Sequence, residues 1–570
     1  GAPAAAPAAA AAAAPAPAKP APPPAAAPPP PAPAAPPANK ITIEINQKML
    51  GTLVKVAGLL FGVLTILVLL FGGLSLYLLI RMREVDPVPR VVKQIPGMDG
   101  NLEQIEKPVA AKDPGKKSAP PKEGATPEKP PKEDEPPPPD DGETIKIGET
   151  FKAFDGKAAD HPGTWTTFRG AKYDNIGPET KLLDRWPAAG PKIHWTLDLG
   201  EGYAGAAVNK GRVYVLDYDE TTKEDALRCF SLEDGKEIWR RSYKVRVLRN
   251  HGMSRTVPAV NDKYVVTIGP RCHVMCVDAT TGDLKWGIDL CKEYGTKVPL
   301  WYTAQCPLID GDVAVIAPGG PGALMIGVDL ETGKVKWKTE NPKNWRMSHS
   351  SILPFTLNNR KMYIYCAIGG IAGYAADGAD VGKILWESLE WAGIQVISPS
   401  PLVLDDGHVF LTTGYGAGSY LLKVSAEGDK FSAKTLWKLG VKDGLACEQQ
   451  TPIYYNKHIY SMNPADSGAR KDQLVCMDPY QNGKILWSSG KEKRYGHYEP
   501  FLLADGKIFV LSEQGTLSIV KATPEKFEPL AEHKVLHGHD AWAPIALAGG
   551  RMILRDSKKM VCLDVTRGAE

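Results

Sequence analysis

Eight copies of one pattern fill the C-terminal two-thirds of the chain, and this repeat limits the fold more than any other feature. Corresponding residues recur about 43 to 51 positions apart, which is the length of a four-stranded propeller blade. Within each copy, apolar and polar residues alternate over four to six positions, as in Arg212–Val215 and Lys507–Val510. A period of two predicts strands rather than helices.

The most regular element of the repeat is Gly-x-x-x-Trp, in which a turn glycine precedes a strand that carries an indole. An aromatic residue of this size at a repeated strand position is expected to be buried between neighbouring blades. We therefore predict that the tryptophans of this column dock one blade onto the next and do not bind a cofactor. They are Trp195, Trp239, Trp286, Trp337, Trp386, Trp437 and Trp487.

The eighth copy lacks its last strand, since the chain ends soon after Asp564 without a Gly-x-x-x-Trp element. A matching segment, Pro191–Trp195, lies just ahead of the first copy. Pairing of this segment with the last blade would remove an open sheet edge. The sequence therefore predicts an all-β protein, an eight-bladed β-propeller closed by its N-terminal strand.

The chain ahead of the ring differs in composition and divides into three parts. Residues 1–40 are mostly Ala and Pro and are expected to be disordered. Residues 52–80 form an apolar run with one charge, Lys55, which is long enough for a transmembrane helix of roughly 20 residues. Residues 84–160, rich in Pro, Lys and Glu, are expected to be a tether, and the propeller is expected over 161–570.

Basic residues flank both ends of the apolar run, so the positive-inside rule does not orient it. The long spacer on its C-terminal side favours a bacterial inner-membrane protein with one span and a periplasmic propeller. The net charge of +3 gives no reason to expect a nucleic-acid partner.

Nine cysteines are present, and four of them occupy one strand column of different blades, Cys229, Cys276, Cys476 and Cys562. Repetition at equivalent positions indicates packing, because free cysteine behaves as a small buried hydrophobe. The chain contains neither a Cys-x-x-Cys-His haem motif nor a paired Cys-x-x-Cys zinc set. We therefore expect no metal site.

Two segments carry a resemblance to a known family. Residues 278–286 and 329–337 resemble the tryptophan-docking repeats of the PQQ-like, or quinoprotein, eight-bladed propellers, and the resemblance extends over about residues 165–570. The segment Trp165–Gly170 is similar to the opening of bacterial PQQ-like repeat proteins, many of them named after the propeller lipoprotein of the outer-membrane β-barrel assembly machinery. The resemblance implies the fold, and leaves open whether the ring is an enzyme or a platform.

The enzymatic branch of this family binds PQQ and calcium at the mouth of the ring, with a vicinal cysteine disulfide beneath the quinone. No Cys-Cys pair occurs in this chain, and only Glu448 with its neighbours Gln449 and Gln450 suggests a cluster of oxygen ligands. We therefore expect no cofactor, and PQQ with calcium is disfavoured.

The segments ahead of each innermost strand should line one mouth of the channel, where aromatic and arginine side chains are typical anchors for a partner. The sequence thus favours a non-enzymatic scaffold that binds or assembles proteins in the cell envelope. The alternatives are a small-molecule sensor, a PQQ-dependent dehydrogenase, or a structural protein that self-associates. The candidate binding residues are Arg249, His251, Arg255, Trp301, Gln305, Trp345, His349, Gln395, Glu448, Gln449, His497, Asp540 and Trp542.

Overall fold

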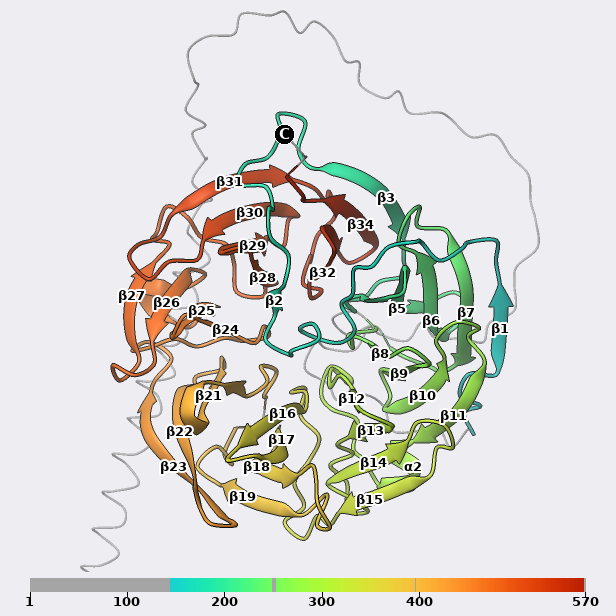
Figure 1. The fold of residues 1–570 in the computed structure, drawn as a ribbon, viewed down its shortest axis with the longest axis horizontal. Helices are drawn as coiled ribbons and strands as arrows, with labels where there is room; N and C mark the ends of the chain where they lie inside the picture. Colours follow the sequence, from blue (N-terminus) through green and yellow to red (C-terminus); the bar gives the residue numbers. More distant parts are fainter. Residues whose placement is uncertain (1–143, 249–252, 395, 568–570) are drawn as a thin grey trace, which may run out of the picture. The chain divides into compact units, whose positions relative to one another are not determined.

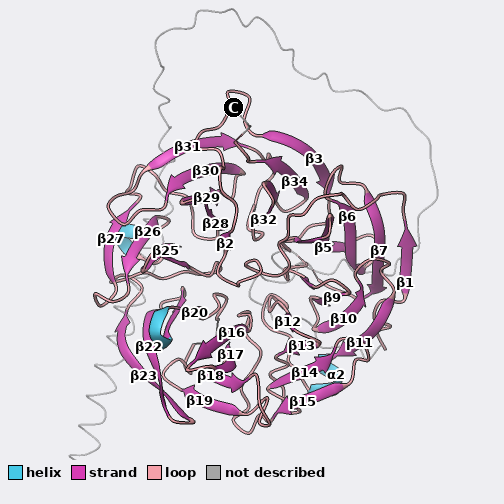
Figure 2. Ribbon diagram, viewed as in Figure 1, coloured by secondary structure: helices cyan, strands magenta, loops and turns pink. Residues whose placement is uncertain are grey.

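Strands dominate the computed structural model, which describes residues 144–248, 253–394 and 396–567. These residues form eight sheets arranged in a ring (Figure 1), and almost no helix is seen among them (Figure 2). The short helices are α2 (Leu290–Tyr294), η1 (Asp405–Gly407) and η2 (Gly468–Arg470). The predicted all-β eight-bladed propeller is confirmed.

Each blade has four antiparallel strands that run in chain order from the channel to the outer edge. In six of the blades a proline lies just ahead of the innermost strand, as Pro258 does before β8 and Pro307 before β12. The first four blades are β4 (Ala207–Asn209), β5 (Arg212–Asp219), β6 (Glu224–Ser231) and β7 (Glu237–Lys244); β8 (Ala259–Val260), β9 (Tyr264–Ile268), β10 (His273–Asp278) and β11 (Leu284–Asp289); β12 (Leu308–Asp310), β13 (Val313–Ile316), β14 (Met325–Asp329) and β15 (Val335–Thr339); and β16 (Leu353–Leu357), β17 (Arg360–Ala367), β18 (Gly370–Ala375) and β19 (Ile384–Ser388).

The last four blades repeat this order, and the eighth borrows its outer strand from the start of the ring. They are β20 (Leu402–Val403), β21 (His408–Thr413), β22 (Gly418–Glu427) and β23 (Lys430–Leu439); β24 (Ile453–Tyr455), β25 (His458–Met462), β26 (Leu474–Asp478) and β27 (Lys484–Ser488); β28 (Phe501–Ala504), β29 (Lys507–Leu511), β30 (Thr516–Lys521) and β31 (Pro529–Lys534); and β32 (Ala546–Ala548), β33 (Arg551–Arg555), β34 (Lys559–Asp564) and β3 (Lys192–Asp198).

The ring closes as the sequence predicts. Strand β3 pairs antiparallel with β34, with Lys192 opposite Asp564 and Asp198 opposite Lys559. The pairing supplies the eighth blade with the strand that its own sequence lacks, and Trp195 of β3 lies in the tryptophan column. The first and last parts of the propeller are therefore joined in one sheet.

The tryptophan column docks consecutive blades through a hydrogen bond and a ring contact. The Nε1–H of Trp286 in blade two donates to the carbonyl oxygen of Leu330 in blade three, at 2.9 Å. A Cβ added to Gly333, the turn glycine of blade three, would lie 2.6 Å from Cγ of that indole. The same donation to the next blade links Trp195 to Leu232, Trp239 to Thr280, Trp437 to Pro479 and Trp487 to Thr523.

Two members of the column are held differently. Trp386 donates to Sδ of Met362 within its own blade, at 3.2 Å, since the fifth blade replaces the Gly-x-x-x-Trp turn by the long hairpin of β22 and β23. Trp337 is half-buried and stacks on Tyr363, with 6.1 Å between ring centroids. A Cβ on Gly382, in the turn ahead of Trp386, would lie 2.7 Å from the Trp337 ring.

The first blade includes residues that precede position 161, where the propeller was expected to begin. Strand β1 (Thr150–Ala153) extends the first blade by pairing antiparallel with β7. Arg241 of β7 holds its guanidinium 4.5 Å above the ring of Phe151. Residues from 144 onward, within the stretch expected as tether, are therefore attached to the ring.

No helix of the described ranges is long and apolar enough to span a bilayer. The predicted span at 52–80 lies outside these ranges, as do segment 1–40 and the tether up to residue 143. The four cysteines of the shared strand column are all buried, as packing residues would be.

Candidate functional site

A segment of chain that precedes the repeats closes one mouth of the channel. This segment, residues 165–177, is called the plug here, and it crosses the centre of the ring in Figure 1. It bridges Val208 of blade one through Trp165 and accepts a hydrogen bond from Val260 N of blade two. Its end, β2 (Ile176–Gly177), pairs in parallel with β28 of blade seven. The sequence resemblance marked the start of this segment, but nothing in the repeat pattern predicted that it covers the channel.

Arg169 fastens the plug to the opposite side of the ring. Its buried guanidinium donates to the carbonyl oxygens of Thr451 at 2.7 Å and Pro452 at 2.9 Å, both in blade six. Further bonds to the carbonyl oxygens of Tyr173 and Asp174 fix the plug's own turn. Burial lowers the pKa of Arg169 to about 10, so the group remains charged at neutral pH.

The other mouth holds a cavity of about 100 Å³. Phe168 of the plug contributes to its lining, so the plug limits the cavity on one side. Most other lining residues come from the segments ahead of innermost strands, which is where the sequence predicted the rim. The side chains that dominate it are Tyr203, Arg255, Trp301, His349, Tyr415, Gln449 and Trp542.

Aromatic rings form two groups around this mouth. Trp301 stacks on Tyr415, with 6.1 Å between centroids. Across the mouth, Trp542 contacts Tyr203 and Tyr498, each with 4.8 Å between centroids. Trp301 has a left-handed backbone, with φ of 63°, a conformation that costs a non-glycine residue free energy and is held by the surrounding fold.

Arg255 supplies a positive charge between the two aromatic groups. Its guanidinium lies 5.4 Å from the centre of the Tyr203 ring, and burial lowers its pKa to about 10. Burial and the Arg255 charge together lower the pKa of His349 to about 4. At neutral pH, His349 is therefore uncharged, and its Nε2–H donates to the carbonyl oxygen of Leu300 at 2.6 Å.

The blade-six side of the mouth is acidic. Burial, and then the charges of Asp466 and Asp472, raise the pKa of Glu448 to about 7. His497 lies between two of these acids, with Nδ1 3.2 Å from Asp472 Oδ1 and Nε2 4.0 Å from Glu448 Oε2. The mouth therefore has a basic side at Arg255 and an acidic side at Glu448.

Five of the predicted rim residues line the cavity together, namely Arg255, Trp301, His349, Gln449 and Trp542. Glu448 and His497 form the acidic cluster beside it, and Asp540 pairs with His539 at 2.9 Å. The predicted residues Arg249, His251 and Gln395 lie outside the described ranges.

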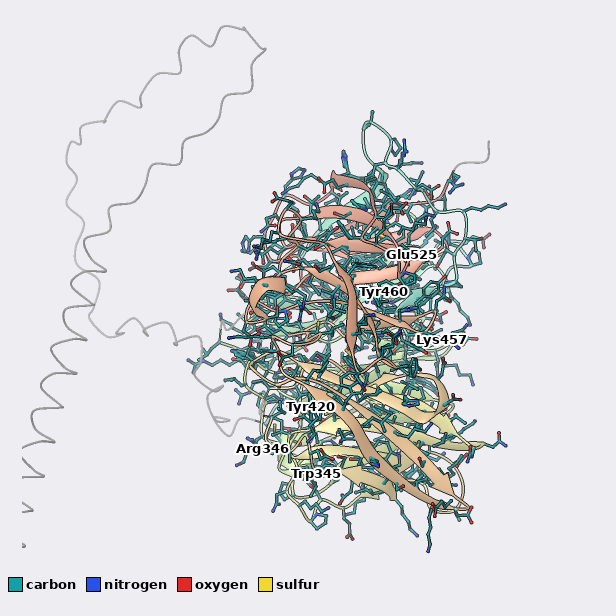
Figure 3. The ribbon with its side chains drawn as sticks, turned by 90° about the vertical axis from the view of Figure 1, so that its left-hand side faces the viewer. Trp345, Arg346, Tyr420, Lys457, Tyr460 and Glu525 are labelled. Carbon is teal, nitrogen blue, oxygen red and sulfur yellow. The ribbon has the colours of Figure 1, made fainter. Side chains whose placement is uncertain are left out.

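Two predicted rim residues have structural positions instead. Gln305 is fully buried and exchanges hydrogen bonds with the backbone of Ala317, at 3.1 and 2.9 Å. Trp345, labelled in Figure 3, is also buried, and a Cβ added to Gly369 or Gly370 would collide with its ring. Gln305 also donates to the hydroxyl of Tyr365 in blade four at 3.2 Å, so both side chains are engaged in packing and hydrogen bonding inside the ring.

Sequence reasoning missed the three aromatic lining residues Phe168, Tyr203 and Tyr415. Phe168 belongs to the plug, and Tyr415 lies in the turn between β21 and β22 rather than ahead of an innermost strand. The sequence did contain a signal for Tyr415, which lies between Gly414 and Gly416. An aromatic side chain in such a glycine turn is expected to be exposed, and is therefore a candidate for binding a partner.

PQQ with calcium, the cofactor that the resemblance raises, would need a cluster of oxygen ligands and a sizeable cavity at this mouth. Calcium needs six to eight oxygen ligands, and within the described ranges no three His, Cys, Asp or Glu side chains lie close enough to hold a metal ion. Glu448, which precedes the lining residue Gln449, is half protonated at neutral pH because its pKa is about 7. A cavity of about 100 Å³ is also smaller than the roughly 300–1,000 Å³ of typical small-molecule sites.

Residues 223–439 match the family model described as outer membrane protein assembly factor BamB. The match confirms the resemblance to PQQ-like propeller repeats that the sequence predicted. A quinone-type alcohol dehydrogenase subunit of Gluconacetobacter polyoxogenes is 30% identical over 209 residues, which is 33% of this chain and 27% of the relative. The chain thus matches about a quarter of the length of this relative.

Two solved structures are similar to this chain at low sequence identity. BamB from Moraxella catarrhalis is 13% identical, with a TM-score of 0.44, over 65% of this chain and 99% of that one. A europium-containing methanol dehydrogenase is 13% identical, with a TM-score of 0.49, over 71% of this chain and 90% of that one. A fold does not determine an activity, so the function depends on the chemistry of the mouth.

Proposed function

We propose that this protein is a non-enzymatic scaffold of the bacterial cell envelope, which holds a protein partner at the open mouth of its propeller. The observation that carries the proposal is the mouth's chemistry, in which Trp301, Tyr415, Tyr203 and Trp542 surround the charge of Arg255. Tryptophan, tyrosine and arginine are enriched among the few residues that carry most of the binding energy at protein interfaces.

The mouth is also held in shape before any partner arrives. Tyr302, next to Trp301, is buried and bonds through its hydroxyl to both the N–H and the carbonyl oxygen of Leu248, at 2.9 and 3.0 Å. Gln450 donates to the carbonyl oxygens of Tyr498 and Trp542. Loops fixed in this way lose little conformational entropy on binding, which favours affinity.

Charge gives the partner an orientation. The basic side at Arg255 and the acidic side, where Glu448 lies near Asp466 and Asp472, would each select the opposite charge on an incoming chain. A shallow cavity suits one or two inserted side chains, with the remaining contact made by the rim.

The second candidate function is a PQQ-dependent dehydrogenase, which rests on the similarity to the quinone-type alcohol dehydrogenase. It is tested by calorimetric titration of PQQ and calcium into the purified chain, followed by a dye-linked alcohol oxidation assay. We expect neither saturable heat nor oxidation. Stoichiometric binding at micromolar affinity or tighter would favour the dehydrogenase.

We further propose that residues 52–80 anchor the protein by one span in the inner membrane, with the propeller in the periplasm. The support is the apolar run itself and the long spacer that follows it. Protease added to spheroplasts should cleave within 84–143 and release the ring. Protection of the ring until the cells are lysed would place it in the cytoplasm.

The scaffold is tested by affinity capture from an envelope extract of the cells that produce the protein. Wild type is compared with Tyr415→Ala at the mouth and with Leu436→Ala, a control of similar exposure (46% and 48%) on the outer strand of the same blade. We expect Tyr415→Ala to lower recovery of a defined partner roughly 10-fold, as for a hot-spot residue, and Leu436→Ala to leave it unchanged. Equal recovery with both variants would contradict binding at the mouth.

A further inference from the structure

A second cavity lies beside the plug, at the end of the channel opposite the mouth that holds Arg255. Its volume is about 540 Å³, which falls within the range of roughly 300–1,000 Å³ that small-molecule sites occupy. Its walls are the plug and the turns that follow the innermost strands of blades one, two and three, at Asn209, Asn261 and Gly311. A Cβ added to Gly311 would meet nothing within 4 Å, which agrees with open space at this wall.

The plug wall of this cavity is held at two points. Thr166 accepts a hydrogen bond from Val260 N of blade two through its carbonyl oxygen, at 2.8 Å. Further along the plug, the half-buried Tyr173 packs against the core cluster that contains Leu308 of blade three and Tyr363 of blade four. Contacts with three blades therefore fix this wall, and the cavity is formed before any ligand binds.

Two asparagines give the lining uncharged polar groups. The amide of Asn209 donates through Nδ2 to the carbonyl oxygen of Asn261 at 3.1 Å, which joins the turns of blades one and two. Asn261 accepts hydrogen bonds from Lys263 N and Tyr264 N through Oδ1, at 2.9 and 2.8 Å. Neither of these two bonds uses the Nδ2 group of Asn261, which carries two N–H donors. The turns thus orient both amides at the cavity.

Charge in the lining is balanced. Among the described residues that line the cavity, the charged ones are the acid Asp262 and the base Lys263. Both are exposed, and Asp262 pairs with Lys210 at 3.2 Å. An anion would favour several basic groups that converge on it, and a metal cation would favour a cluster of oxygen ligands that includes several acids. One acid and one base supply neither, so charge does not favour an ionised ligand.

The rest of the lining distinguishes between two kinds of neutral ligand. Val260, Ile309 and the ring of Tyr173 supply apolar surface, whereas Asn261 and the hydroxyl of Thr166 supply hydrogen bonds. A hydrocarbon would displace water from these polar groups and leave them without partners, which costs free energy. A saccharide has C–H groups on the faces of its ring and hydroxyl groups around its edge, so it matches both kinds of surface.

We propose that this cavity binds a neutral saccharide unit. One face of the sugar ring packs on Tyr173 and Ile309, and the hydroxyl groups exchange hydrogen bonds with Asn261 and Thr166. The proposal goes beyond the scaffold function and does not rest on it, because the cavity and the mouth share no lining residue. Such a site would attach the propeller to a glycan while the mouth remains available to a protein partner.

The test is a titration of the purified full chain with two neutral disaccharides, maltose and N,N′-diacetylchitobiose, followed by saturation-transfer NMR. The protein is kept in a detergent without a sugar headgroup, because such a headgroup would compete for the site. We expect at least one disaccharide to bind saturably, with an affinity that inorganic phosphate does not change. Failure of both disaccharides to bind, or their displacement by phosphate, would overturn the proposal.

Substitutions in the plug locate the binding. Ala171 is exposed and lines the cavity, so Ala171→Trp should fill it without disturbing the core and abolish binding of the disaccharide. Thr166→Val removes one hydroxyl and should weaken binding about 2- to 10-fold, as the loss of one hydrogen bond does. Ala469→Trp is the matched control, because Ala469 is exposed in η2 of blade six, and it should bind as wild type does. Binding that Ala171→Trp leaves unchanged would place the sugar elsewhere and contradict the proposal.

Discussion

Replacement of Gly333 by alanine should weaken the docking of blade three onto blade two. The added Cβ would lie 2.6 Å from Cγ of Trp286, and the backbone φ of 71° is left-handed. The conformation alone costs a residue with a Cβ about 1–2 kcal/mol. The overlap adds about 1–3 kcal/mol, as overpacking does, because Trp286 cannot withdraw without losing its hydrogen bond to Leu330.

Gly311→Ala is the matched control, since Gly311 belongs to the same blade and has a φ of 60° with nothing within 4 Å of its added Cβ. It should cost only the conformational part, about 1–2 kcal/mol. Urea unfolding of both variants, followed by circular dichroism, gives the two losses of unfolding free energy. Equal losses would refute the account of why the repeat requires glycine at this turn.

Three further predictions concern buried charge. Burial raises the pKa of Glu499 from 4.5 to about 7, so the free energy of unfolding should fall by about 3 kcal/mol as the pH rises from 4.5 through 7. Glu499→Gln should remove this loss, and urea unfolding at pH 4.5 and 8 measures it. The pKa of His349 falls from 6.5 to about 4 on folding. The free energy of unfolding is therefore highest above pH 6.5 and decreases by about 3 kcal/mol as the pH falls to 4 and below. In His349→Gln, the free energy of unfolding should depend less on pH over this range. Arg169→Ala should release the plug and expose residues 165–177 to protease, and unchanged protection would contradict its role as anchor.

The repeat was sufficient to predict the ring because the same pattern is present in the sequence of each blade. Turn glycines, docking indoles and proline starts all lie within one blade, so local sequence determines them, and the missing strand of blade eight identified its own partner in β3. The outward hydrogen bond that five of the tryptophans make depends on the next blade, which explains why Trp386 differs where the hairpin of blade five is longer.

The site was predictable only in part. Position ahead of an innermost strand brought Arg255, Trp301 and His349 to the mouth, but it could not separate them from Gln305, whose amide is used by the backbone of Ala317. The plug was missed because its contacts, such as that of Arg169 with Thr451, join residues far apart in the chain and lie outside any repeat.

The most direct test of the scaffold is photo-crosslinking from the mouth of the propeller in living cells. A benzophenone amino acid is placed at Tyr415, which is exposed at the mouth, and separately at Leu436 on the outer strand of the same blade. The account predicts a discrete protein adduct from position 415 that is lost when Trp301 is replaced by alanine, and none from position 436. Adducts of equal yield from both positions, or no adduct from position 415, would contradict the claim that the mouth holds a protein partner.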